Sequence, residues 1–337
     1  MGTTLSWMLV AAAVTSFLIT AVSGCVLVPL LHRLHFGQTI REDGPTWHNK
    51  KQGTPTMGGL CFILGQVLTL GIIYATFCRK APELLSQRAV QAVLLVLFLA
   101  LGSGLIGFLD DFIKVLRHRN LGLLAWQKII MQVLVTGGFM MGLHSMGLLT
   151  TVISLPVAGA VDLGLLYYPI AFLGIIFMVN AVNLTDGLDG LDSCVTFVVM
   201  LGYILGASLL GFFHVSLVAT AMAGACAGFL VWNFYPAKVF MGDTGSMYLG
   251  GIVTGLSFIM CRPELIIFFG IVYIWDAMTV VIQRVYFKLT HGKRIFKMTP
   301  IHHAFEMRGW NEIRIDGFFS LIAFMGAALG LLYIYLV

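Results

Sequence analysis

Long apolar runs separated by short polar loops make up most of this chain. A helix that crosses the hydrocarbon core of a bilayer needs roughly 20 mostly apolar residues. We expect ten such spans, at about residues 5–31, 57–78, 90–110, 126–147, 163–181, 191–211, 213–233, 246–261, 264–286 and 317–337. The pattern predicts an all-α, polytopic integral membrane protein with about ten transmembrane helices.

Composition agrees with this class. Of the 337 residues, 59% are hydrophobic and only 10% are charged, whereas soluble domains carry about 25% charged residues. The longest polar stretches, residues 32–56 and 287–316, leave no room for a soluble domain. We therefore expect residues 1–337 to form a single transmembrane domain.

Basic residues predict the orientation of the spans. With ten spans, 16 of the 20 Lys and Arg residues fall in loops on one side of the membrane. Cytoplasmic loops carry an excess of Lys and Arg, so this side is expected to be cytoplasmic, with both termini outside. The first span lacks the basic start of a cleaved signal and is too long for one.

Several acidic residues lie at or beside predicted span ends, all on the cytoplasmic side. These are Asp110, Asp111, Asp186, Asp189, Asp192 and Asp243. A charged side chain at the membrane centre costs at least about 2.5–3.5 kcal/mol, and such residues usually mark functional sites. Three loops that direct carboxylates to one face indicate a site there more strongly than helix caps or surface ion pairs.

The segment "GFLDDFIK" places Asp110 and Asp111 next to each other. Adjacent helical residues point about 100° apart, so the two cannot occupy one site equally unless the helix ends between them. One is expected to face the reaction, and the other to support it or share a cation. A helical ion pair with Lys114 is the simpler alternative, but it accounts for only one aspartate.

The segment "NAVNLTDGLDGLD" has a polar residue at every third position: Asn180, Asn183, Asp186, Asp189 and Asp192. Gly187 and Gly190 allow the backbone to leave the helix, so that several of these groups can turn inward together. Such groups suit the hydroxyls of a sugar or a nucleoside base. The alternative is a glycine-rich turn whose side chains cap the next span.

Three further segments carry candidate chemistry. In "FMGDTGS", Asp243 is either a helix N-cap or a Mg²⁺ ligand beside a bound phosphate. In "PIHHAFE", His302 and His303 lack the spacing of a helical zinc pair; they can donate to a pyrophosphate, support the site, or be ordinary interfacial histidines. The block 43–60 offers Lys51 as a phosphate-side cation. Together these groups suggest transfer of a phosphoryl group from a soluble nucleotide to a membrane-embedded acceptor.

Five blocks, in this order, resemble the bacterial phospho-N-acetylmuramoyl-pentapeptide-transferases, which belong to the polyprenyl-phosphate N-acetylhexosamine-1-phosphate transferases: "GPTWHNKKQGTPTMGG", "LDDFIK", "NAVNLTDGLDGLD", "FMGDTGS" and "PIHHAFE". The resemblance implies a ten-span enzyme of the bacterial cell membrane with a cytoplasmic active site. It also implies the reaction of UDP-N-acetylmuramoyl-pentapeptide with undecaprenyl phosphate, giving lipid I and UMP in peptidoglycan biosynthesis, with Mg²⁺ as cofactor. We expect no nucleic-acid partner, and a homodimer stays open.

The resemblance also implies residue roles. The catalytic residues would be Asp110, Asp111, Asp243 and His303, with the metal held by Asp243 and Asp110. The substrate-binding residues would be Lys51, Asn180, Asn183, Asp186, Asp189, Phe240 and His302, with Phe240 able to stack on uracil. We expect Asp110 to take the proton of the lipid phosphate. Many family members have a third consecutive histidine where this chain has Ala304.

Two other functions stay open at this point. A sister transferase would hand N-acetylglucosamine 1-phosphate to the same lipid, although "GTPTMGG" and "PIHH" favour the muramoyl enzyme. An ion-coupled transporter would place acids near the midplane of its spans, whereas these acids are expected at cytoplasmic ends.

Overall fold

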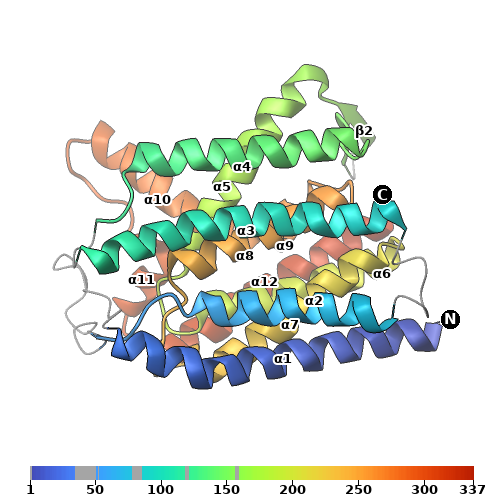
Figure 1. The fold of residues 1–337 in the computed structure, drawn as a ribbon. Helices are drawn as coiled ribbons and strands as arrows, with labels where there is room; N and C mark the ends of the chain where they lie inside the picture. The colour runs from blue at the N-terminus through green and yellow to red at the C-terminus, as the bar shows by residue number, and fades with distance from the viewer. Residues whose placement is uncertain (1, 35–50, 52, 78–85, 118–120, 156–158) are drawn as a thin grey trace.

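The computed structural model describes residues 2–34, 51, 53–77, 86–117, 121–155 and 159–337. Within these residues it is a bundle of long helices (Figure 1). They are α1 (Gly2–Arg33), α2 (Gly59–Phe77), α3 (Gln87–Leu116), α4 (Ala125–Ser145), α5 (Tyr167–Thr185), α6 (Leu191–Leu209), α7 (Phe213–Asn233), α8 (Gly242–Ile259), α10 (Ile271–Leu289) and α12 (Glu312–Leu336). Shorter elements are the 3₁₀ turn η3 (Gly164–Leu166), α9 (Leu265–Phe269) and α11 (Ile301–Glu306).

Seven of the described helices are long and apolar enough to cross a membrane: α1, α2, α3, α5, α6, α7 and α12. In lipid every backbone polar group must find its partner within the protein, and a helix satisfies this requirement internally. The structure thus supports a helical, multi-pass membrane protein. The count of ten spans stays a prediction, as does the single-domain organisation over residues 1–337.

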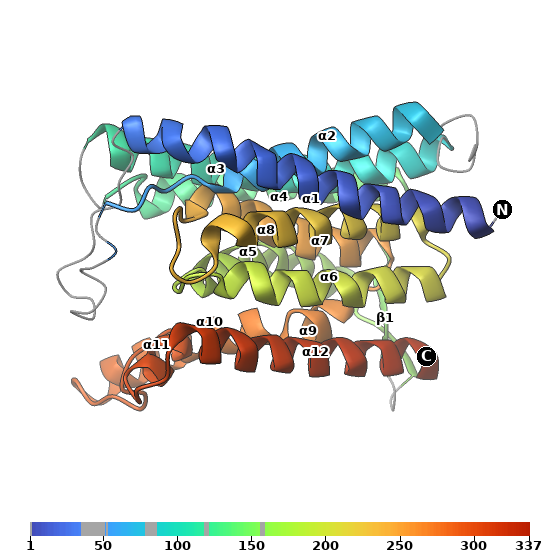
Figure 2. The ribbon, with the colours of Figure 1, turned by 90° about the horizontal axis from the view of Figure 1, so that it is seen from below.

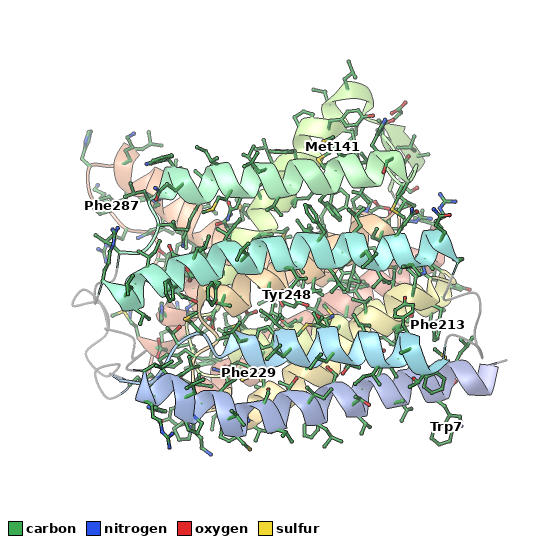
Figure 3. All side chains as sticks on the ribbon, in the orientation of Figure 1. Trp7, Met141, Phe213, Phe229, Tyr248 and Phe287 are labelled. Carbon is green, nitrogen blue, oxygen red and sulfur yellow. The ribbon has the colours of Figure 1, made fainter. Side chains whose placement is uncertain are left out.

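Helix α8 lies at the centre of the bundle. Every residue from Thr244 to Ile259 is buried, and small residues let neighbouring helices approach closely. A Cβ atom at Gly251, for example, would lie 2.5 Å from the Cα of Ala100 on α3. Tyr248 points into the interior, whereas Trp7 and Met141 point outward on the apolar surface (Figure 3).

Two predicted elements differ from the structure. A short antiparallel hairpin follows α4, with β1 (Val152–Leu155) paired to β2 (Gly159–Asp162), so the chain is not purely helical. The single span predicted at 264–286 is divided at Gly270 into α9 and α10. A Cβ atom at Gly270 would lie 2.7 Å from Met178 Cε, so glycine permits close packing at the break.

The two ends of the bundle differ in what they carry. Helix α1 begins and α12 ends at the same end (Figures 1 and 2). The last turns of α3 and the beginning of α8 lie at the opposite end (Figures 1 and 2). The acidic motifs are therefore gathered far from both termini.

Candidate active site at one end of the helix bundle

The aspartate pair lies inside α3, not at its end. The span predicted to finish at residue 110 continues as helix to Leu116, which corrects that boundary. At a rise of 1.5 Å per residue, Asp110 is about 35 Å from the start of α3, beyond a hydrocarbon core of about 30 Å. Both side chains are almost fully buried, at 1% and 2% exposed. Because the helix is longer than the core is thick, it can carry these acids without placing them at the membrane midplane.

The two carboxylates bind different elements. Asp110 Oδ1 accepts the backbone N–H of Leu123, at 2.7 Å, in the loop before α4. Asp111 Oδ2 accepts the backbone N–H and the hydroxyl of Thr244, at 2.9 and 2.7 Å, in the first turn of α8. The expected divergence of adjacent side chains is therefore present, although the helix does not end between them.

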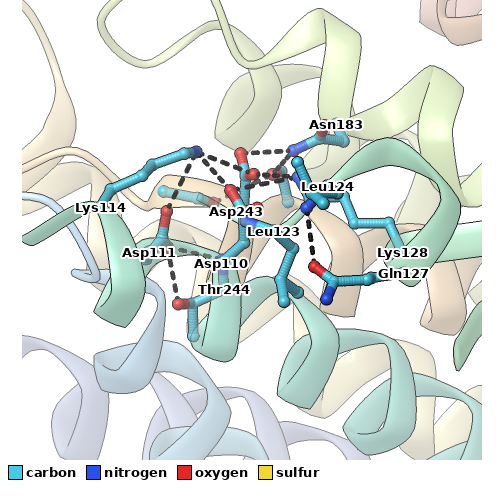
Figure 4. Close-up of polar contacts among 12 residues, drawn as sticks. Asp110, Asp111, Lys114, Leu123, Leu124, Gln127, Lys128, Asn183, Asp243 and Thr244 are labelled. Atoms are coloured by element: carbon cyan, nitrogen blue, oxygen red, sulfur yellow. Dashed lines mark hydrogen bonds and ion pairs between the residues drawn. The ribbon is translucent and has the colours of Figure 1, made fainter. Parts of the chain in front are cut away.

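A third carboxylate completes a cluster with this pair (Figure 4). One oxygen each from Asp110, Asp111 and Asp243 lies within 4.8 Å of the others. The N-cap of α8 is Met241, so Asp243 does not cap this helix. Its Oδ1 instead accepts a hydrogen bond from Asn183 Nδ2 at 3.0 Å. Three segments that are distant in sequence, on α3, α5 and α8, thus meet at one point.

Two lysines lie against these carboxylates. Lys114 Nζ is 2.6 Å from Asp110 Oδ2 and 3.0 Å from Asp243 Oδ2. Lys128 Nζ, from α4, is 3.1 and 2.8 Å from the same two oxygens. The helical ion pair between Lys114 and Asp110 is confirmed, and it extends to a second helix. Lys128 was not singled out from sequence; its only signal is a lone cation near the start of an apolar span.

The last turn of α5 contributes Asn183, and Asp186 is the C-cap residue of the same helix. Asn183 Nδ2 also donates to Ser246 Oγ at 2.8 Å, whereas Asn180 pairs with Gln132 of α4 at 3.0 and 3.2 Å. Helix α5 ends at Thr185, and Gly190, with φ +81°, precedes α6. The backbone therefore leaves the helix where the two glycines predicted it would.

Asp186 lies close to several other acids at the end of α5. Burial, followed by the charges of Asp192 and Asp243, raises the pKa of Asp186 well above its ordinary value. Its protonated form is consequently favoured compared with an exposed aspartate. In that form the side chain is both a hydrogen-bond donor and an acceptor.

Lys51, Asp189 and Glu312 form a second polar group. Lys51 Nζ lies 2.7 Å from Asp189 Oδ1 and 2.6 Å from Glu312 Oε2. Burial lowers the pKa of Lys51, but the hydrogen bonds to these two carboxylates outweigh it, so the pKa is raised. The ammonium group is therefore charged at neutral pH. Glu312 was not predicted from sequence, where it is one acid in a polar loop.

Phe240 is positioned by its backbone. Its N–H donates to the carbonyl of Pro55, and its carbonyl accepts from Gly58, both at 2.8 Å. These bonds fasten the segment before α2 to the start of α8. The half-buried ring of Phe240 is thus brought to the same end of the bundle as the carboxylates.

The two histidines differ in their surroundings. His302 is fully buried, and its Nδ1 lies 2.6 Å from Asp276 Oδ2. His303 is partly exposed, with Nδ1 2.7 Å from Glu306 Oε2. Of the two, His303 is the one that solvent, and hence a soluble substrate, can reach.

Close approach of α3 and α8 sets the geometry of the carboxylate cluster. A Cβ atom at Gly107 would lie 2.0 Å from the backbone oxygen of Asp243. Alanine is a better helix former than glycine by about 1 kcal/mol, yet Gly107→Ala must push the two helices apart. A displacement of about 1 Å can cost 10²-fold in rate, and we expect a loss of at least tenfold in turnover.

The matched control for this prediction is Gly137→Ala on α4, where a Cβ atom would meet nothing within 4 Å. This variant should keep its activity. Initial rates and melting temperatures of both variants test the idea. Equal rates for the two alanine variants would show that this contact does not set the geometry.

The fold and this site define a class: a multi-pass helical membrane protein with buried carboxylates, lysines and amides gathered at one end. Comparisons with known proteins agree. The family described as "Glycosyl transferase family 4" matches residues 93–261. The pattern described as "Phospho-N-acetylmuramoyl-pentapeptide-transferase signature 1" matches residues 51–63.

Relatives along nearly the whole chain carry one name, phospho-N-acetylmuramoyl-pentapeptide-transferase. The protein of Clostridium kluyveri is 41% identical over 96% of this chain and 98% of its own length. The protein of Halalkalibacterium halodurans is 41% identical over 94% of this chain and 95% of its own length. The protein of Acetivibrio thermocellus is 42% identical over 94% of this chain and 92% of its own length. The chain belongs to the phospho-N-acetylmuramoyl-pentapeptide-transferase family and is a membrane transferase. The family resemblance predicted from the five motifs is thereby confirmed.

Proposed function

We propose that this protein transfers phospho-N-acetylmuramoyl-pentapeptide from its UDP derivative to undecaprenyl phosphate, giving lipid I and UMP. The observation that carries the proposal is the cluster of Asp110, Asp111 and Asp243 with two lysines, in a chain of this family. Anionic groups suit a metal ion, and cations suit phosphates. A reaction between two phosphate-bearing substrates requires both.

The carboxylates fit Mg²⁺ as a cofactor. Mg²⁺ prefers oxygen ligands and is usually held by one or two carboxylates together with substrate phosphates. Asp243 and Asp110 would hold the ion, since their oxygens approach each other and Asp243, at 20% exposed, is the more accessible. When bound, Mg²⁺ supplies neutralisation of the charge that develops on the pyrophosphate.

The chain's own side chains account for the remaining steps. Asp110 takes the proton of the lipid phosphate, whose oxygen then attacks the β-phosphorus of the donor while the bond from this phosphorus to the α-phosphate oxygen breaks and UMP leaves. Lys114 and Lys128 neutralise phosphate oxygens in a site of low dielectric constant. His303 lies at the same end and supplies a further hydrogen-bond donor to the pyrophosphate.

A second set of residues would hold the nucleotide and the sugar. Asp189 and Phe240 would lie beside the nucleotide, with the ring of Phe240 available for stacking on uracil, and Lys51 would face its phosphates. Asn183 and Asp186 offer hydrogen bonds to hydroxyl groups. Asn180 and His302 would support the substrate-binding residues without touching the substrate, because Asn180 is paired with Gln132 and His302 is buried.

We propose that the site faces the cytoplasm and that both termini lie outside. The Lys and Arg excess in the loops at the site end supports this orientation. In a cysteine-free background, a cysteine at Lys238 should react only with reagent on the cytoplasmic side. A cysteine at the exposed Asp162, in the hairpin at the other end, should react only from outside. Reaction of Lys238→Cys from outside alone would reverse the orientation.

An assay of the detergent-purified protein tests the function. It combines labelled UDP-N-acetylmuramoyl-pentapeptide, undecaprenyl phosphate and Mg²⁺, and measures UMP and lipid-linked product. We expect both products, and a rate with UDP-N-acetylmuramoyl-pentapeptide at least tenfold higher than the rate with UDP-N-acetylglucosamine. Equal or reversed preference would indicate the sister transferase, and no product with either donor would contradict the proposed reaction.

A further inference from the structure

A carboxylate and an imidazole form a buried pair behind the loop that joins α5 to α6. Asp276 on α10 and His302 at the start of α11 are both fully buried. Asp276 Oδ2 lies 2.6 Å from His302 Nδ1, and Asp276 Oδ1 accepts the backbone N–H of His302 at 3.4 Å. Both oxygens of the Asp276 carboxylate thus contact His302, and these two contacts set the position of its ring.

The second ring nitrogen of His302 faces the loop. An ionised carboxylate only accepts hydrogen bonds, so we assign the shared proton to Nδ1. Nε2 is buried and has no hydrogen-bond partner among the described residues. A Cβ atom at Gly187 would lie 2.2 Å from Nε2. The edge of the ring is therefore packed directly against the backbone between Asp186 and Asp189.

Helix α10 holds the far end of this loop as well. Tyr273, one turn before Asp276, shares a hydrogen bond of 2.7 Å with Thr196 of α6. Thr196 in turn donates to Asp192 Oδ1 at 3.2 Å. Asp186 and Asp189, which are assigned to binding of the UDP-linked substrate, thus lie between two buried contacts to helix α10.

We propose that Asp276 is a positioning residue of the transfer reaction. Through Nδ1 of His302 it holds the imidazole against Gly187. The loop is thereby kept in the geometry in which Asp186 and Asp189 meet the donor. This inference rests on the proposed function. Outer-shell groups that orient metal ligands typically cost 10–100-fold in affinity or activity when they are removed, and we expect an effect of this size for Asp276.

Asp276→Asn tests the proposal with little change in volume. The amide has one oxygen in place of two, so it cannot accept from both Nδ1–H and the backbone N–H. We expect the ratio kcat/KM for the UDP-linked donor to fall about 10- to 100-fold, mainly through KM. Hydrogen exchange of the amides in residues 186–191 should become faster in the same variant.

A double-mutant comparison separates positioning from general destabilisation. If Asp276 acts through His302, adding Asp276→Asn to His302→Asn should cause little further loss. Glu264→Gln is the matched control, because Glu264 is another buried acid and accepts from Tyr333 Oη at 2.7 Å near the opposite end. It should leave both kcat/KM and the exchange of residues 186–191 unchanged.

Several outcomes would overturn the proposal. The proposal fails if Asp276→Asn keeps the kcat/KM and the hydrogen exchange of the wild type. It also fails if the losses of the two single variants multiply in the double variant, or if Glu264→Gln shows the same changes as Asp276→Asn. If Asp276→Asn does not fold, Gly187→Ala tests the contact from the loop side and should raise KM similarly; an unchanged KM would count against the proposal. If the wild type makes no lipid-linked product, the proposed function fails, whereas the exchange comparison still decides whether Asp276 holds the loop.

Discussion

Replacing Asp243 by asparagine is expected to lower the rate of lipid-linked product formation by about 10²-fold or more and to weaken the response to Mg²⁺. Asp243 is the most exposed member of the carboxylate cluster, at 20% against 1% for Asp110. The substitution removes an anionic ligand oxygen and places an amide before Lys114 and Lys128. A higher Mg²⁺ concentration should therefore be needed for half-maximal rate.

Asp110→Asn is the informative comparison. If Asp243 is the main Mg²⁺ ligand and Asp110 mainly handles the proton of the lipid phosphate, this variant should lose turnover by about 10²- to 10⁴-fold. Its Mg²⁺ dependence should shift less than that of Asp243→Asn. Its amide oxygen can still accept from Leu123, which preserves the loop contact. Initial rates against Mg²⁺ concentration and pH, with melting temperatures, measure both effects. A larger shift of the Mg²⁺ midpoint in Asp110→Asn would exchange the two roles, and an exposed control, Asp162→Asn, should resemble the wild type.

Lys51→Met is expected to lower the free energy of unfolding by about 3–5 kcal/mol, because removing one partner leaves buried charge without compensation. Asp189 and Glu312 are only 3% and 10% exposed in their side chains. Their repulsion should also loosen the junction between α12, the α5–α6 loop and the segment before α2. Activity should fall together with stability.

The pH dependence of this effect follows from the raised pKa of Lys51. A cation whose pKa is raised on folding contributes fully below its unfolded pKa, about 10.4 for lysine, and this contribution is lost as pH rises through the folded value. The gap in melting temperature between wild type and Lys51→Met should therefore persist from pH 7 to 9. Lys238→Met, at an exposed lysine 5.3 Å from the ring of Trp232, is the control. Equal melting temperatures for Lys51→Met and Lys238→Met would show that the buried Lys51 ion pairs contribute little to stability.

Membrane location and family were predictable because both depend on short, contiguous stretches of sequence. Apolar runs of membrane length require helices wherever they occur, and the five motifs are contiguous stretches. The positions at which the chain leaves the helix near Gly187 and Gly190 were likewise local. What failed was the length of individual elements: α3 continues past Asp110, the span at 264–286 breaks at Gly270, and a hairpin follows α4.

These failures have physical causes that a local stretch of sequence does not show. Two acids normally end an apolar span, but here Lys114 and Lys128 approach them and supply opposite charge inside the bundle, so the helix continues. Lys128 comes from another helix, and neither its distance to Asp110 nor the contact of Gly107 with Asp243 is visible in any stretch of sequence. The hairpin has strands of only four residues each, too short to differ in pattern from the apolar runs beside it.

The sequence by itself determined that this chain enters a bilayer as helices and to which family it belongs, and it predicted which polar residues carry its chemistry, because hydrophobic runs and motif spacing are properties of neighbouring residues. Only the tertiary structure decided how those residues are used. It places Asp110 toward α4 and Asp111 toward α8, pairs Lys51 with Glu312, and buries His302 on Asp276 beneath Gly187. Such partners lie up to 261 residues apart, and the packing of small residues between helices, not the order of the chain, brings them within hydrogen-bond distance.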